Sequence, residues 1–247
     1  VGHLREVVKL LSDAGLRIRL QKCHLASNTL DYLGHRISAS GLEPSPKKTE
    51  AVQNWPIPNS VKAVQSFLGF CNLYRRYVKH YSDIASPLYD LTKLNPKDKF
   101  TWTPECAKAF QDLKYALTHA PVLASPRVGQ NESFVLVSDA SDRALGAVLL
   151  QYDITGKNLH PVSYFAKTLN SAQRDYLVYD KELLGICSAI HEYRVYLEGC
   201  KNIITDHQTL QHLLTQKTSS RRHNGWIQTL TPYASYLEIV YPLQVVT

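Results

Sequence analysis

The sequence of 247 residues contains no methionine and starts at Val1. We therefore expect it to be a piece of a longer polypeptide. It also lacks a run of 18 apolar residues and a charged leader followed by an apolar segment. These two absences argue against a membrane-spanning helix and a secretory signal. Internal repeats and low-complexity tracts are absent too, and a hydrophobic content of 44% favours globular domains with real cores.

Cysteine is scarce: the chain has five, widely spaced, and no two of them form a CxxC pair. An odd number without paired spacing argues against a disulfide scaffold and against a zinc site. The sequence therefore predicts reduced, mostly buried thiols in an intracellular protein.

Positive charge is concentrated in the first half of the chain. Residues 1–130 hold 18 Lys and Arg against 10 Asp and Glu, a net +8, whereas residues 131–247 hold 10 against 11, a net −1. This asymmetry favours a phosphate-binding part beside an acidic centre.

A predicted hairpin in residues 133–151 carries an acidic residue at its mouth. Residues 134–137 form an apolar run typical of a central strand, which ends at Asp139, and residues 144–150 form a second run. Within this second run, Gly146 leaves room for a close neighbour. Asp139 is thus predicted at the carboxyl end of a strand, where ligands of α/β sheets gather.

Two further carboxylates have comparable positions. Residues 171–197 have the apolar spacing of a helix, and Glu182 falls near its apolar stripe. A carboxylate there is costly unless it is paired, protonated or bound to a metal. Asp206 ends the short apolar run 203–205. Three carboxylates without neighbouring Cys or His ligands suit Mg²⁺ or Mn²⁺, which can activate water on a phosphodiester.

Each of these residues also has a structural interpretation. A strand-end aspartate such as Asp139 or Asp206 often forms a turn, and Glu182 alone fits a charge at the edge of a helix stripe. We interpret the other acidic residues nearby as solvated turn or helix-start charges: Asp142, Asp175 and Asp180.

The three carboxylate motifs together resemble the ribonuclease H domain of gypsy-type (LTR) retrotransposon reverse transcriptases. They read Asp-Ala-Ser-Asp from 139, Tyr-Asp-Lys-Glu-Leu-Leu from 179 and Thr-Asp-His-Gln-Thr-Leu from 205. The resemblance implies an α/β (α+β) fold with a mixed five-stranded sheet and flanking helices. It also implies Mg²⁺-dependent (or Mn²⁺-dependent) cutting of RNA in RNA–DNA hybrids, with Asp139, Glu182 and Asp206 as catalytic metal ligands.

Helical signals dominate residues 44–120. Ser45, Ser60 and Thr103 are predicted N-caps, and the prolines at 56–58 and 96 break the helices. In residues 67–78, aromatic side chains alternate with Arg75 and Arg76. These arginines could bind phosphates, although buried aromatics with solvent-exposed arginines are the more frequent arrangement.

The first 43 residues are predicted to form a helix over 3–14, a strand over 16–20 and an extended stretch over 30–38 that pairs with the next segment of the chain. Within the resemblance, Tyr32, Gly34 and His35 match the palm loop that grips the primer end, whereas a simple hairpin glycine is the alternative for Gly34. Residues 67–78, with Arg75 and Arg76, match the thumb of the same enzymes.

After the helix with Glu182, the sequence predicts a short helix over 208–214, a polar loop over 215–223 and a last strand over 237–241. A third strand is predicted before it, at 161–165. The family's polymerase aspartates would lie upstream of Val1. Its fourth ribonuclease carboxylate would lie after Thr247, so we expect weak cleavage by the chain as it stands.

The resulting domain organisation is a palm remnant over 1–43, a helical thumb or connection over 44–128 and a ribonuclease H-like domain over 129–247. The expected partners are RNA–DNA hybrids, primer–template nucleic acid and the upstream palm and fingers of the polyprotein, with no membrane. The expected location is a cytoplasmic replication particle or the nucleus. The competing hypothesis is a catalytically degenerate remnant that binds nucleic acid without cutting it.

Overall fold

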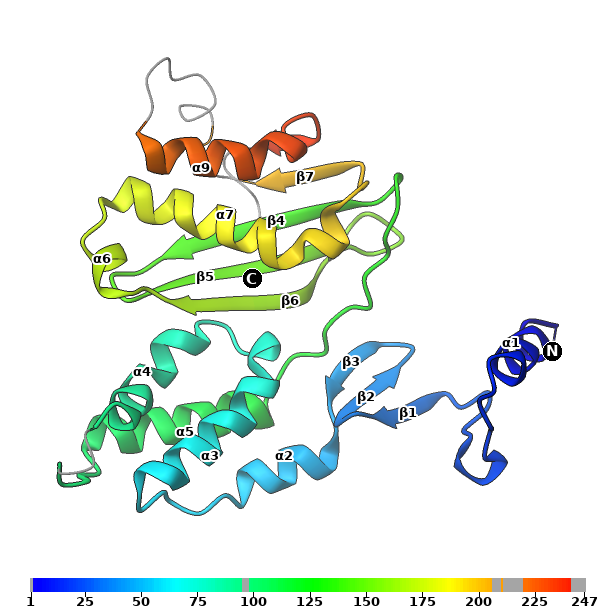
Figure 1. Ribbon diagram of the computed structural model, residues 1–247, viewed down its shortest axis with the longest axis horizontal. Coiled ribbons are helices and arrows are strands. Elements are labelled where there is room, and N and C mark those ends of the chain that lie inside the picture. The colour runs from blue at the N-terminus through cyan, green and yellow to red at the C-terminus, as the bar shows by residue number, and fades with distance from the viewer. Residues whose placement is uncertain (1, 95–97, 206–209, 211–219, 241–247) are drawn as a thin grey trace.

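The computed structural model describes residues 2–94, 98–205, 210 and 220–240. A five-stranded sheet with helices above it lies over a group of helices, and a small three-stranded sheet and an N-terminal helix lie to one side (Figure 1). None of the helices in these described ranges is long and apolar enough to cross a membrane.

The five-stranded sheet has the order β6-β5-β4-β7-β8. Strands β4, β5 and β6 pair antiparallel, whereas β7 and β8 join β4 in parallel register, which confirms the predicted mixed sheet. The apolar runs of the sequence become the strands. Their bounds are β4 Ser133–Ala140, β5 Ala144–Tyr152, β6 Leu159–Thr168, β7 Asn202–Thr205 and β8 Leu237–Ile239.

Helices α7 (Val178–Leu197) and α9 (Arg221–Leu230) cover one face of this sheet. The single helix predicted over 171–197 is wrong, because a short α6 (Ser171–Arg174) precedes α7. Asn170 and Gln173 close a capping box at the start of α6, and the chain leaves helical geometry after residue 174.

The polar loop predicted to run through residue 223 is also wrong at its end. Ser220 accepts a hydrogen bond from the His223 amide and caps α9, whose Trp226 and Leu230 are buried. Because these two apolar residues are four positions apart, they share one face of the helix. The predicted helix over 208–214 falls on residues that lie, except for buried Leu210, outside the described ones.

Four helices form the lower group, which we call the thumb unit. Ser60 and Thr103 cap their helices through side-chain hydrogen bonds, as predicted, whereas Ser45 occupies its N-cap without one. The predicted apolar faces are buried in one core. The helices are α2 Pro46–Gln53, α3 Val61–Leu73, α4 Tyr81–Thr92 and α5 Pro104–Thr118, with the 3-10 helix η2 Arg75–Tyr77 between α3 and α4.

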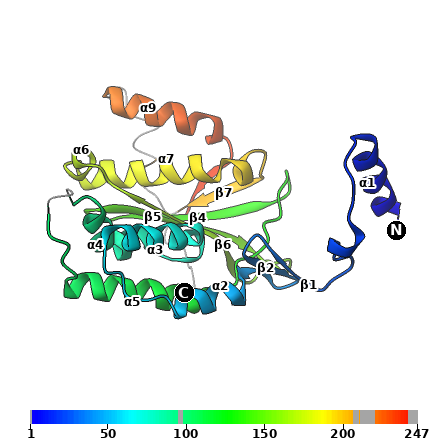
Figure 2. The same cartoon turned by 60° about the horizontal axis from the view of Figure 1, so that its bottom comes forward.

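The N-terminal part has little contact with the rest. Helix α1 (Gly2–Asp13) has no buried residue and lies apart in both views (Figure 1, Figure 2). The strand predicted over 16–20 is wrong. Residues 16–19 are irregular, and the 3-10 helix η1 (Leu20–Lys22) follows. Alternating Leu and Arg side chains alone do not make a strand without a partner to pair with.

Residues 29–44 form the small antiparallel sheet: β1 Thr29–Tyr32, β2 His35–Ser38 and β3 Gly41–Pro44. The predicted extended stretch over 30–38 is therefore itself a hairpin. Leu33 and Gly34 turn the chain, and both have positive φ, 49° and 85°.

The second face of the five-stranded sheet is covered by the thumb unit (Figure 2). Helix α4 contacts β5 and β6, and η2 contacts β6. Ala166 of β6 belongs to the thumb core, although it lies in the other half of the sequence. The two halves of the chain therefore share buried surface.

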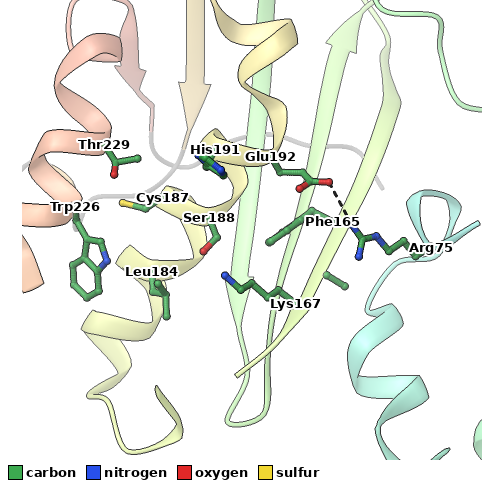
Figure 3. Close-up of a pocket in the computed structure, with 11 residues that line it drawn as sticks. Arg75, Phe165, Lys167, Leu184, Cys187, Ser188, His191, Glu192, Trp226 and Thr229 are labelled. Carbon is green, nitrogen blue, oxygen red and sulfur yellow. Dashed lines mark ion pairs between the residues drawn. The ribbon is translucent and has the colours of Figure 1, made fainter. Parts of the chain in front are cut away.

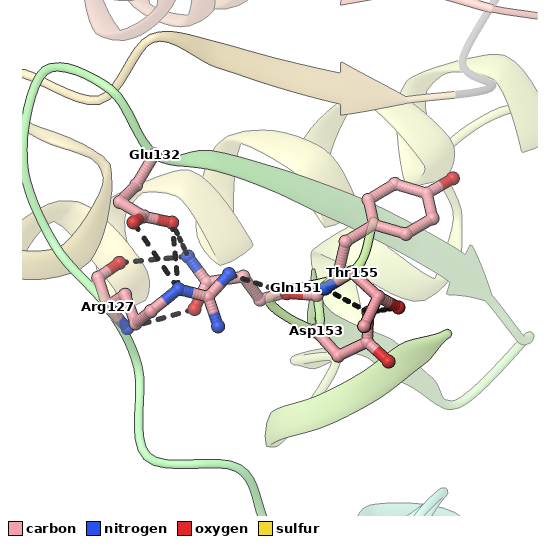
Figure 4. Close-up of polar contacts among 6 residues, drawn as sticks. Arg127, Glu132, Gln151, Asp153 and Thr155 are labelled. Atoms are coloured by element: carbon pink, nitrogen blue, oxygen red, sulfur yellow. Dashed lines mark hydrogen bonds and ion pairs between the residues drawn. The ribbon is translucent and has the colours of Figure 1, made fainter. Parts of the chain in front are cut away.

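The connection between the halves is held along its length. Leu123 is fully buried and pairs with Leu42 of β3. Farther on, the Arg127 guanidinium donates to the Glu132 carboxylate at 3.2 Å and to the Tyr152 carbonyl at 2.6 Å (Figure 4). The side-chain amide of buried Gln151 exchanges two hydrogen bonds of 2.9 Å with the Arg127 backbone. These contacts fix where the chain enters β4.

Four of the five cysteines are buried, as predicted for reduced core thiols, and Cys23 is half-buried. Burial raises the pKa of the Cys187 thiol to about 12, which keeps it protonated and unsuited to nucleophilic chemistry.

Candidate functional site

Asp139 lies next to the last residue of β4, as the sequence predicts, and its cross-strand partner is Gly146. Its carboxylate is exposed, and within the described residues its one hydrogen bond is a 2.9 Å contact from the neighbouring Ala140 amide. The oxygen atoms of Asp139 are thus largely free to accept a ligand.

Glu182 lies in the first turns of α7 and is half-buried. Its neighbour Lys181 is buried and donates to the Asp142 carboxylate at 2.9 Å, so the start of α7 is held against the β4–β5 turn. No hydrogen bond or ion pair to Glu182 is found within the described part of the chain. The hydrogen bond from Lys181 also lowers the pKa of the Asp142 carboxyl.

Asp139 and Glu182 lie at the same end of the sheet but on different sides of it. Ser138 faces α7, because its Oγ would lie 3.8 Å from a Cβ added to Gly185. Successive side chains of a strand alternate, so Asp139 points to the thumb side. Asp206 lies outside the described residues. Among the residues that the structure describes, no group of three His, Cys, Asp or Glu side chains is close enough to hold a metal ion. The convergence of the three carboxylates stays a prediction.

The predicted nucleic-acid residues of the small sheet pack against the thumb unit. The Tyr74 hydroxyl donates to the Gly34 carbonyl at 3.2 Å, and the His35 Nδ1 lies 2.8 Å from the Tyr77 hydroxyl. Burial, followed by the charge of Arg76, lowers the pKa of His35. Tyr32, in contrast, is 58% exposed. Tyr32 is thus available to a partner, while Gly34 and His35 hold the hairpin in place.

Arg75 and Arg76 lie where the thumb unit meets the sheet. Arg75 is exposed, and its Nη2 lies 3.6 Å from Glu192 Oε1 on α7. Arg76 is half-buried, with an Nε that is buried without a hydrogen-bond partner in the described part of the chain. The ion pair of Arg75 and the burial of Arg76 are features that local sequence patterns did not indicate.

Part of the chain matches a known protein family. The model of the RNase H-like domain found in reverse transcriptase matches residues 102–204, which include α5, Asp139 and Glu182. Residues 102–204 belong to this RNase H-like family. The predicted boundary near residue 128 lies inside the match and stays a prediction.

Sequence similarity to transposon polyproteins extends over most of the chain. The retrovirus-related Pol polyprotein from transposon 297 of Drosophila melanogaster is 35% identical over 97% of this chain, which spans 22% of that polyprotein. The transposon Tf2-3 polyprotein of Schizosaccharomyces pombe is 33% identical over 88% of this chain and is covered to 16%. The chain is thus similar to retrotransposon Pol polyproteins over about a fifth of their length.

A solved structure shares the fold across both halves. The foamy viral protease-reverse transcriptase in complex with RNA/DNA hybrid superposes with a TM-score of 0.77 over 99% of this chain and 33% of its own, at 24% identity. This likeness supports the arrangement of thumb unit, small sheet and RNase H-like domain as a fold.

The structure also shows a polar cluster at Asp180, so the interpretation of this residue as a solvated charge is wrong. The Asp180 side chain is 13% exposed, and its two oxygens lie 2.8 Å from Arg222 Nη1 and from His223 Nε2. The Arg222 guanidinium also stacks over the Tyr176 ring at 3.7 Å. No sequence signal indicated this cluster, because its partners are 42 and 43 residues away.

A large cavity between the two halves of the chain contains none of the predicted carboxylates. It has a volume of about 490 Å³ and lies between α7, α9, β6 and η2 (Figure 3). Trp226 lines one end, the Arg75–Glu192 ion pair closes the other, and Lys167 lies between them. Cavity size alone would therefore have indicated a different site from the one the motifs predict.

Proposed function

We propose that this chain is the part of a retrotransposon reverse transcriptase polyprotein that cuts the RNA strand of RNA–DNA hybrids with the help of divalent metal ions. The observation that carries the proposal is Asp139: an exposed carboxylate at the carboxyl end of β4, without an ion pair among the described residues and inside the matched RNase H-like region. Ligands of α/β sheets bind at such strand ends.

The two described carboxylates fit a hard cation. Asp139 and Glu182 offer carboxylate oxygens that the described residues leave almost without partners, and Mg²⁺ and Mn²⁺ prefer oxygen ligands. We propose that the two side chains reach one metal site around the end of the sheet, Asp139 from β4 and Glu182 from α7. Asp206 is the third proposed ligand. A metal ion bound there would supply an activated water and neutralise charge on the phosphodiester.

The remaining contribution of the chain is positioning. The Lys181–Asp142 contact holds the first turn of α7 beside the β4–β5 turn, which fixes the backbone that carries Glu182. The net charge of +8 in residues 1–130 attracts phosphates without base preference. We propose that exposed Arg75 and Tyr32 contact the hybrid or primer–template, with Arg76, Gly34 and His35 setting their positions.

The test is an assay on a labelled RNA–DNA hybrid with Mg²⁺ and with Mn²⁺, using the chain together with the sequence that surrounds it in its reading frame. Asp139→Asn and Glu182→Gln are expected to reduce the cleavage rate by about 100-fold or more, since each removes a charge at the reacting phosphate. Asp142→Asn is the matched control, because an amide oxygen can still accept from Lys181.

Two outcomes would count against the proposal. Cleavage that survives Asp139→Asn would show that the site is misassigned. Hybrid binding by the parent protein without any cutting, in either metal, would favour the degenerate nucleic-acid-binding remnant instead.

A further inference from the structure

A second cavity lies on the thumb side of the sheet, directly beside Asp139. Its volume is about 170 Å³, and it is enclosed by the turn between η2 and α4 on one side and the β4–β5 hairpin on the other. Lys79 and His80 line it from the thumb unit, and Asp139, Gly146 and Tyr164 line it from the sheet. Residues 79 and 80 thus face a predicted metal ligand from the other half of the chain.

The backbone conformation at His80 directs its side chain toward the β4–β5 hairpin. His80 adopts left-handed geometry, with φ 54° and ψ 31°, immediately before the first residue of α4. This conformation is disfavoured for residues other than glycine, so it persists only where the surroundings require it. The imidazole Nδ1 would lie 3.6 Å from a Cβ added to Gly146, the cross-strand partner of Asp139.

The turn is anchored to the hairpin by a direct hydrogen bond. The Ser141 hydroxyl donates to the Asp83 carboxylate at 2.9 Å, which joins the first turn of α4 to the end of β4. The position of Lys79 and His80 relative to Asp139 is therefore set by contacts on both sides of the cavity.

Lys79, His80 and Asp139 do not pair with one another across this cavity in the described ranges. The side chains of Lys79 and His80 are exposed, and no ion pair or hydrogen bond to either is found in the described ranges. The Asp139 carboxylate has none beyond the Ala140 amide. Burial raises the pKa of Tyr164, so its phenol stays neutral. Polar groups that converge in a cavity without satisfying one another are the usual sign of a ligand site.

We infer that Lys79 and His80 form a phosphate-binding subsite for the nucleic-acid backbone, placed on the thumb unit beside the nuclease carboxylate Asp139. An ammonium and an imidazole are donors suited to phosphate oxygens, and Asp139 alone would repel an anion, so the bound phosphate is held from the thumb side. This inference rests on the proposed function, and it links hybrid binding by the thumb unit to the cutting site.

The experiment measures Lys79 directly, without cleavage. The protein is treated with an acetylating reagent in EDTA, free and saturated with an RNA–DNA hybrid, and the modified lysines are quantified by mass spectrometry. Lys79 is expected to react several-fold more slowly in the complex. Exposed Lys62, in the first turn of α3, lines neither cavity described above and serves as the internal control whose rate stays the same.

Variants give a second readout. Lys79→Ala is expected to reduce the salt dependence of hybrid binding by about 0.7 to 0.9 in log–log slope, as for one lost phosphate contact, and Lys79→Arg should restore it. His80→Asn keeps a residue that tolerates left-handed geometry and should weaken binding without unfolding the protein. Lys62→Ala should leave the slope unchanged.

Equal acetylation of Lys79 in the free and bound protein, or an unchanged slope for Lys79→Ala, would overturn the subsite. Failure of the hybrid to bind at all would overturn it too. Failure of the proposed function is seen separately: protection of Lys79 together with no cleavage by the parent protein supports the subsite but removes the nuclease. Asp139→Asn should abolish cutting and leave Lys79 protected.

Discussion

Gly34 is the position where one methyl group should disturb the small sheet most. Its φ of 85° is left-handed, and a Cβ added there would overlap the Tyr74 hydroxyl oxygen. Tyr74 cannot move aside cheaply, because it is only 3% exposed and its ring packs against His35 and Phe70. Gly34→Ala therefore combines backbone strain with a displaced side chain.

The magnitude follows from these two effects. Alanine in left-handed geometry costs roughly 1–2 kcal/mol. Displacing Tyr74 also removes its 3.2 Å hydrogen bond to the Gly34 carbonyl. Such a bond contributes about 0.5–1.5 kcal/mol net. We expect Gly34→Ala to lower the free energy of unfolding by roughly 1.5–3.5 kcal/mol.

Urea unfolding, followed by circular dichroism, measures this difference. Gly156→Ala is the matched control, because Gly156 has a φ of 71° and nothing within 4 Å of an added Cβ. It should lose only the strain of about 1–2 kcal/mol. A double-mutant cycle with Tyr74→Phe isolates the part of the destabilisation that comes from displacing Tyr74, since removing the hydroxyl relieves the overlap.

The reasoning is refuted if Gly34→Ala and Gly156→Ala lose the same stability. It is equally refuted if Tyr74→Phe adds its full cost on top of Gly34→Ala instead of recovering part of it.

Three further predictions concern the contacts between units. Burial lowers the pKa of His35 below its ordinary 6.5, so the unfolded chain takes up a proton there at a higher pH than the folded protein does. The free energy of unfolding should therefore be at its full value above about pH 6.5 and decrease as the pH drops. His35→Asn should flatten this pH profile. Asp180→Ala removes the partner of both Arg222 and His223 on α9 and should lower the free energy of unfolding by about 1.5–3 kcal/mol. A change in Trp226 fluorescence should accompany this loss, and an unperturbed spectrum would contradict the prediction. Glu192→Gln frees Arg75 from its ion pair and should tighten hybrid binding, whereas Arg75→Ala should weaken it. If an anisotropy titration gives both variants the affinity of the parent protein, Arg75 serves only the contact between the units.

Local chemistry in the sequence determined the elements that carry the proposed site. The apolar runs on either side of Asp139 are short and bounded by polar turns, so strands β4 and β5 follow from pattern alone. The caps Ser60 and Thr103 were equally readable, because an N-cap needs only residues within one turn of itself. The motif spacing that led to the RNase H-like family is also a property of the chain.

Contacts between distant segments were decided only by the tertiary structure. Residues 16–20 alternate like a strand but pair with no strand in the described part of the chain. Asp180 looks like a solvent-facing charge until α9, more than 40 residues later, brings Arg222 and His223 to it. Hydrogen bonding and burial depend on partners that a local pattern does not contain.

The side of the sheet that Asp139 faces was also decided only by the tertiary structure. Its position at a strand end was fixed by the residues around it, but its cavity with Lys79 and His80 exists because the thumb unit covers the second face of the sheet. Packing of one unit on another depends on the three-dimensional shape of both surfaces. Sequence pattern therefore located the carboxylate, and the fold decided which side chains lie beside it.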